Sequence, residues 1–123
     1  MIKYHKIEEV IISELIDDSL IISHVQDALD MMGECGMKNC NRIIIREQNL
    51  NPDFFRLHTG FAGEMLQKFS TYNFKLAIIG DFSKYKSKSL QDFIRESNGG
   101  NRIYFVENLV SAFNKLTRKS CTK

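Results

Sequence analysis

Two short runs of apolar residues constrain the fold of this chain more than any other feature. Residues 42–46 place three isoleucines between two arginines, and residues 74–80 read Phe-Lys-Leu-Ala-Ile-Ile-Gly. Runs of this length and composition are typical of strands buried on both faces of a parallel sheet. Between them, residues 54–72 carry apolar side chains at helical spacing, and parallel strands need a crossover of that kind. The pattern therefore predicts an α/β fold.

The rest of the chain extends this alternation of strands and helices. Residues 7–16 are rich in β-branched side chains and predict a strand, or a hairpin whose turn lies near Lys6 or Ser13. Further patterns predict a helix over 24–37 capped by Ser23, a helix capped by Ser87 or Ser89 that ends near Asn98, a strand over 102–106 and a helix over 108–116. The expected fold is a mixed sheet of four or five strands, mostly parallel with an antiparallel N-terminal edge, covered by about four helices.

Length and composition fit one cytoplasmic domain over residues 1–123, with a frayed C-terminal tail at about 118–123. The net charge of +2 does not favour nucleic acid as a partner. Acidic residues interrupt the N-terminal apolar residues, so neither a signal peptide nor a membrane partner is expected. Three cysteines without a CxxC pair predict reduced thiols rather than a metal site: Cys35, Cys40 and Cys121. No motif indicates a cofactor.

Several blocks of the sequence resemble a bacterial family of small proteins, the domain-of-unknown-function family 4180. These blocks are 26–30, 53–55, 59–69, 75–82, 87–90, 92–94 and 96–98. More distantly, the layout is similar to the STAS domain of anti-sigma-factor antagonists, in which a phosphorylatable Ser or Thr lies near the start of a helix. Thr59 falls at about that place, preceded by His58 where the STAS pattern usually has Asp. This second resemblance implies a STAS-like domain with a regulatory protein partner.

The segment around Thr59 is the first candidate site. The pattern over 54–72 predicts either one long helix or a short helical turn followed by a helix that begins near Thr59, with Gly60 at the break. If a helix begins at Thr59, its free N–H groups favour an anion, either a phosphate on Thr59 or a bound ligand. Gly60 and Gly63 would allow close approach, and Glu64 and Gln67 could hydrogen-bond a partner. Alternatively, Thr59 is only a cap and the glycines only allow tight packing.

The loops after the two apolar strands are the second candidate site. Ligand crevices in open α/β sheets lie beyond the carboxyl ends of the strands, where Glu47 and Asp81 could face each other with Ser83, Ser87 and Ser89 nearby. Two carboxylates there could perform acid–base chemistry or bind a divalent cation. Alternatively, Asp81 only caps its own loop and Glu47 is solvated. The sequence contains no HExxH, GxSxG or local Cys–His pattern, so no catalytic residue is assigned.

Three functional hypotheses follow. The first is a non-enzymatic module that binds a regulatory protein partner on the segment 59–72 and the Asp81 loop, with a switch at Thr59; whether the chain forms a homodimer stays open. The second is small-molecule or metal-dependent binding or catalysis in a crevice near Glu47 and Asp81. A concave pocket with converging polar groups would favour the second, and a flat or convex apolar patch would favour the first. The third, weak nucleic-acid binding through the lysines of 84–88, predicts a steep dependence on salt.

Overall fold

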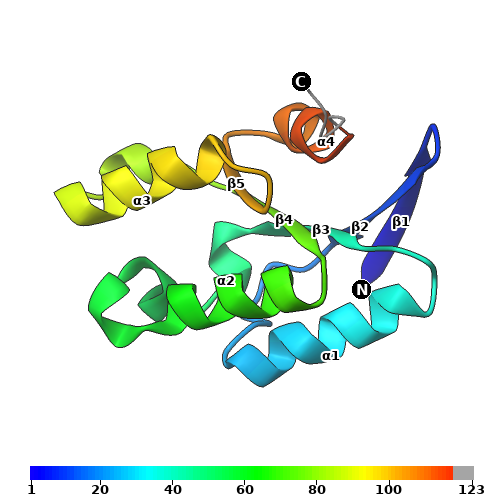
Figure 1. Cartoon of the computed structure of the whole chain (residues 1–123), viewed down its shortest axis with the longest axis horizontal. Coiled ribbons are helices and arrows are strands. Elements are labelled where there is room, and N and C mark those ends of the chain that lie inside the picture. Colours follow the sequence, from blue (N-terminus) through cyan, green and yellow to red (C-terminus); the bar gives the residue numbers. More distant parts are fainter. Residues whose placement is uncertain (118–123) are drawn as a thin grey trace.

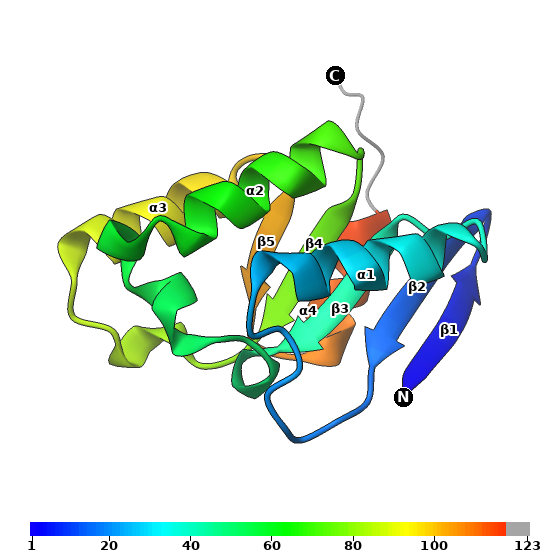
Figure 2. The same cartoon turned by 90° about the horizontal axis from the view of Figure 1, so that it is seen from below.

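Five strands form one mixed sheet in which every strand lies next to its neighbour in the sequence. A computed structural model of the chain describes residues 1–117, so the expected tail at 118–123 and Cys121 lie outside the described residues. The antiparallel pair β1 (Ile2–Ile7) and β2 (Val10–Leu15) forms one edge of the sheet, and β3 (Arg42–Arg46), β4 (Lys75–Ile79) and β5 (Ile103–Val106) follow in parallel. Figure 2 shows this order from β1 to β5. The predicted mixed sheet with an antiparallel N-terminal edge is confirmed.

The helices divide unequally between the two faces of the sheet. The crossover helices α1 (Val25–Gly36), α2 (Phe61–Thr71) and α3 (Lys88–Asn98) pack on one face. Each connects a strand to the next one in the same direction across the sheet, and the right-handed rule for such crossovers therefore directs all three helices to the same side. The last helix, α4 (Leu109–Thr117), packs on the opposite face (Figure 1).

Alternation along the strands explains how one sheet serves two cores. In β3, Ile43 and Ile45 face the three crossover helices, whereas Ile44 faces α4. All three isoleucines are at most 1% exposed, because both faces of the strand are covered. The uninterrupted apolar runs seen in the sequence thus reflect burial on both faces.

One side chain caps part of the open edge of β5. The backbone N–H of Phe105 donates to the Asn98 side chain at 2.7 Å, and the Asn98 amide donates back to the Phe105 carbonyl at 3.2 Å. At this residue Asn98 therefore makes the hydrogen bonds that a sixth strand would make, which shortens the unpaired edge.

The structure decides between the open alternatives for several boundaries. The hairpin turns at Glu8, which has a φ of 58°, and not at Ser13, which is buried within β2. The N-cap of α1 is His24 and not Ser23, because the Asp27 carboxylate reaches back and accepts from the N–H groups of both residues. At α3, Ser87 is the cap.

The predicted break near Thr59 is also present. Three short 3₁₀ turns (Glu47–Asn49, Pro52–Phe55 and Leu57–Thr59) precede α2, which begins at Phe61 rather than at Thr59. Gly60 separates the last turn from the helix, because its φ of 78° is a left-handed conformation that other residues adopt only at a cost. Within residues 1–117, no helix is long and apolar enough to cross a membrane.

Candidate functional site

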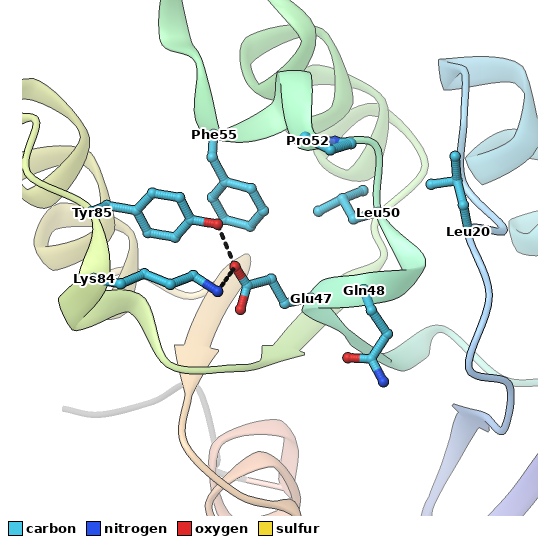
Figure 3. Close-up of a pocket in the computed structure, with 8 residues that line it drawn as sticks. All are labelled: Leu20, Glu47, Gln48, Leu50, Pro52, Phe55, Lys84 and Tyr85. Carbon is cyan, nitrogen blue, oxygen red and sulfur yellow. Dashed lines mark hydrogen bonds and ion pairs between the residues drawn. The ribbon is translucent and has the colours of Figure 1, made fainter.

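A cavity of about 440 Å³ lies beyond the carboxyl ends of β2, β3 and β4 (Figure 3). Its wall combines residues from the three loops that follow these strands, so the fold brings together segments that are distant in the sequence. We refer to it as the Glu47 cavity, lined by Leu20, Glu47, Gln48, Leu50, Pro52, Phe55, Lys84 and Tyr85. Open α/β folds bind ligands at this end of the sheet, beyond the carboxyl ends of the strands.

One buried amide, Asn49, joins the first two of these loops. Its Oδ1 accepts from the N–H of Arg46 at the end of β3, while its Nδ2 donates to the carbonyls of Asp17 and Ser19, each at 2.9 Å. Asn49 is fully buried, and these bonds satisfy both ends of its amide. The residue thereby fixes the position of Leu20 relative to Glu47.

A second asparagine, Asn51, positions the part of the cavity wall that contains Pro52 and Phe55. Its side chain accepts from the N–H of Asp53 and caps the 3₁₀ turn that begins at Pro52, while its amide donates to the carbonyl of Ser23 at 2.9 Å. Proline suits the first position of such a turn, because it has no N–H to leave unpaired. The turn directs Phe55 toward the cavity.

Glu47 is the polar centre of the cavity. Its Oε2 accepts from the Lys84 ammonium at 2.8 Å and from the Tyr85 hydroxyl, and its side chain is only 17% exposed. Its Oε1 lies against Gly80: a Cβ at that position would stand 2.8 Å from this oxygen and 3.0 Å from the Phe82 ring. A larger residue at position 80 would displace the carboxylate, so Gly80 has a role in positioning Glu47. Its place after β4 in the sequence did not reveal this role.

Tyr85 is held as a hydrogen-bond donor. Burial, together with the hydrogen bond to Glu47 and the charge of that carboxylate, raises the pKa of the Tyr85 hydroxyl far above its ordinary value. The Tyr85 ring stacks on Phe55, with centroids 4.9 Å apart and planes 13° apart. Gln91 fixes the loop from below, because its amide donates to the carbonyls of Phe82 and Tyr85. The cavity thus has one rigid aromatic wall beside one carboxylate.

Of the two carboxylates that the sequence singled out for this region, the structure places only Glu47 in the cavity. Asp81 is exposed, and its carboxylate accepts from the hydroxyl and the N–H of Ser83, at 2.6 and 3.2 Å. These bonds lower the pKa of Asp81. Asp81 therefore caps its own loop, as the alternative interpretation has it. Ser87 caps α3, and Ser89 lies exposed in the first turn of that helix.

The residues of the first candidate site share an exposed surface elsewhere. The Thr59 hydroxyl lies 2.8 Å from the carbonyl oxygens of Asp53 and Arg56. It also accepts from the N–H of Phe61 at 3.3 Å. Thr59 thus ties the 3₁₀ turn to the start of α2. The remaining candidates are exposed as well: Gly60, Gly63, Glu64 and Gln67.

Several residues of the Glu47 cavity were not identified from the sequence. Lys84 entered only as one of the lysines considered for nucleic-acid binding, Phe55 only within the family-resemblance block 53–55, and Tyr85 was not singled out. The nearest sequence signal was the aromatic Tyr85 in an otherwise charged segment. Within the described part of the chain, no group of three or more His, Cys, Asp or Glu side chains is arranged to hold a metal ion.

Comparison with known protein families gives one match. Residues 7–116 match the family described as Domain of unknown function (DUF4180). No curated protein and no solved structure matches the chain significantly. The residues of the Glu47 cavity all fall within the matched segment.

Proposed function

Since the chain belongs to the DUF4180 family, whose description assigns no activity, we propose its function from the geometry of the site: it binds a small molecule in the Glu47 cavity. One observation supports this proposal above the others. A largely buried carboxylate, a hydroxyl donor and a partly exposed ammonium meet in a cavity whose remaining lining is apolar apart from Gln48. Small-molecule sites typically combine an apolar lining with a few converging polar groups in a volume of roughly 300–1,000 Å³.

The lining suggests binding rather than covalent chemistry. None of its eight residues is a serine, threonine, cysteine or histidine, and the lysine and the tyrosine among them are both paired with Glu47. Glu47 already accepts two hydrogen bonds, so its role is to orient a bound group. The Phe55–Tyr85 stack offers a flat apolar surface to the remainder of the ligand.

A cavity-filling variant tests this proposal. Leu20 lines the cavity and is 50% exposed, so Leu20→Trp fills the space at little expected cost in stability. The matched control is Val110→Trp, which places the same ring on α4 at a position that is 68% exposed. A fragment library is screened by amide chemical shifts. We expect fragments that shift amides of the three cavity loops in wild type and in Val110→Trp, and no such shifts in Leu20→Trp. Fragments that bind all three proteins alike would contradict the proposal.

A second candidate function is that of a STAS-like module, which binds a regulatory protein partner on its surface. It is supported by the common exposure of Thr59, Gly63, Glu64 and Gln67. A phosphate on Thr59 would remove its hydroxyl as a donor to the carbonyls of Asp53 and Arg56 and would thereby loosen the turn before α2.

An affinity pull-down distinguishes this second function. The bait proteins are wild type, a Thr59→Glu, Glu64→Ala double variant, and Val110→Ser as a control on the opposite face of the sheet. A partner retained by wild type and by the control but lost by the folded double variant would support a surface on α2. Identical partners for all three baits would exclude it.

A further inference from the structure

Lys84 lines the Glu47 cavity and pairs with its carboxylate although much of the lysine side chain is exposed. Its side chain is 55% exposed, yet its ammonium lies 2.8 Å from Glu47 Oε2 and 5.4 Å from the centre of the Tyr85 ring. An ion pair with so exposed a lysine contributes little stability, because water and salt screen the attraction and the long side chain loses freedom. The ammonium can therefore leave for solvent readily.

Glu47 does not have the same freedom. Its side chain is 17% exposed, and its Oε1 lies against Gly80, where a Cβ would stand only 2.8 Å away. A largely buried carboxylate needs hydrogen bonds or a positive charge to offset its desolvation. If Lys84 leaves, a cationic group of a ligand at the same point again compensates the charge of Glu47. An anionic group there would be repelled by the carboxylate.

The wall next to Glu47 also suits a cation. The Tyr85 ring, stacked on Phe55, presents an aromatic face within reach of the Lys84 ammonium. Aromatic faces attract cations through the negative charge density above the ring, most strongly where water is displaced. Beyond this point the lining is apolar apart from Gln48, and it can take a hydrocarbon chain against Leu20, Leu50 and Pro52.

We propose that the ligand of the Glu47 cavity is a small organic cation, a primary ammonium or guanidinium on a short hydrocarbon body, and that the Lys84 ammonium holds the place of its charged group in the free protein. This inference rests on the proposed function, because it names the class of ligand for the same cavity. The ligand's cation pairs with Glu47 Oε2 and faces Tyr85, while Lys84 swings into solvent.

Three probes of similar size and different charge test this inference: hexylammonium, hexanoate and hexanol. Each is titrated into the full chain, and amide shifts of the cavity loops are followed by NMR. We expect hexylammonium to bind most tightly, hexanol more weakly, and hexanoate most weakly. Glu47→Gln keeps an oxygen for the Tyr85 hydroxyl, so the cavity should stay intact. It should weaken hexylammonium by about tenfold, the scale of one charge-assisted hydrogen bond, and leave hexanol nearly unchanged.

Removal of Lys84 gives the sharper result. Lys84→Ala removes the internal competitor, so hexylammonium should bind several-fold more tightly than to wild type. Lys86→Ala is the matched control, because it changes the net charge equally from an exposed position in the same loop. Unchanged or weaker hexylammonium binding to Lys84→Ala would overturn the inference. Preferred binding of hexanoate, lost in Lys84→Ala, would also overturn it but leave the proposed function standing. If no probe shifts the cavity amides, both fail.

Discussion

Glu14 offers a direct test of how the face of the sheet that carries α4 is stabilised. This residue lies in β2, and its side chain is only 5% exposed. One carboxylate oxygen is 2.9 Å from His5 Nε2 on the neighbouring strand β1, and the other accepts from Arg46 Nη2 at 2.8 Å. Burial alone would raise the pKa of Glu14, but the hydrogen bonds from Arg46 and His5 outweigh it and hold the pKa below its ordinary value.

We expect Glu14→Gln to lower the free energy of unfolding at pH 7 by about 2 kcal/mol. Removing one partner of a fully buried ion pair costs about 3–5 kcal/mol. The estimate here is smaller, because Arg46 is 29% exposed and can recover water, and because it keeps a hydrogen bond to the Leu15 carbonyl. The glutamine also retains an oxygen that can accept from Arg46.

The difference in unfolding free energy between wild type and Glu14→Gln should be largest at pH 7 and should shrink as the pH falls. A carboxylate whose pKa is lower in the folded than in the unfolded protein stabilises the fold above its unfolded pKa of roughly 4.3, and this contribution is lost as the pH falls through the folded value. Urea unfolding of wild type and Glu14→Gln between pH 7 and pH 3.5 measures it. The exposed Glu9→Gln is the control, with an expected change below about 0.5 kcal/mol. An equal difference between wild type and Glu14→Gln at both ends of the pH range would refute the reasoning.

Three further predictions concern other parts of the fold. Asn98→Ala removes both hydrogen bonds to the edge residue Phe105 and should lower the free energy of unfolding by about 2 kcal/mol in urea; an unchanged midpoint would count against the edge role. Gly60→Ala forces a side chain into a left-handed conformation and should destabilise by about 1 kcal/mol, with α2 retained by circular dichroism; a gain in stability would contradict this. The buried thiols of Cys35 and Cys40 should react with iodoacetamide much more slowly in the native protein than in urea, as read by peptide mass spectrometry; equal rates would show that this region opens freely.

Much of the fold could be predicted because its signals are local. The isoleucines of β3 form an apolar run that only a strand covered on both faces explains, and the break before α2 follows from Gly60 alone. The strand β1 was less evident: the pattern began at Ile7, and a turn near Lys6 was one of two alternatives. As an edge strand, β1 carries lysines between its apolar residues, which weakens the apolar pattern.

The site was predictable only in part, because its geometry depends on contacts between distant segments. The place of Glu47 followed from its position directly after a buried strand. Its partner Tyr85 lies 38 residues away, and the approach of the two depends on the stacking against Phe55 and on the Gln91 amide. Asp81 follows its own strand one position later, after Gly80, and a serine two residues further on satisfies its carboxylate locally. A sequence pattern alone does not distinguish these outcomes.

The sequential order of the strands also bears on how the domain assembles during synthesis. Each parallel strand pairs with the one made just before it, so a growing chain can complete the sheet one strand–helix–strand unit at a time. The helix α4 is made after all five strands, and it covers Ile12, Ile44 and Ala77 and joins the sheet through the bond from Arg42 to the Leu116 carbonyl. Until these nine residues leave the ribosome, the nascent sheet presents an uncovered apolar face of the kind that chaperones bind. Docking of α4 is thus the step that covers the second face of the sheet and completes the domain.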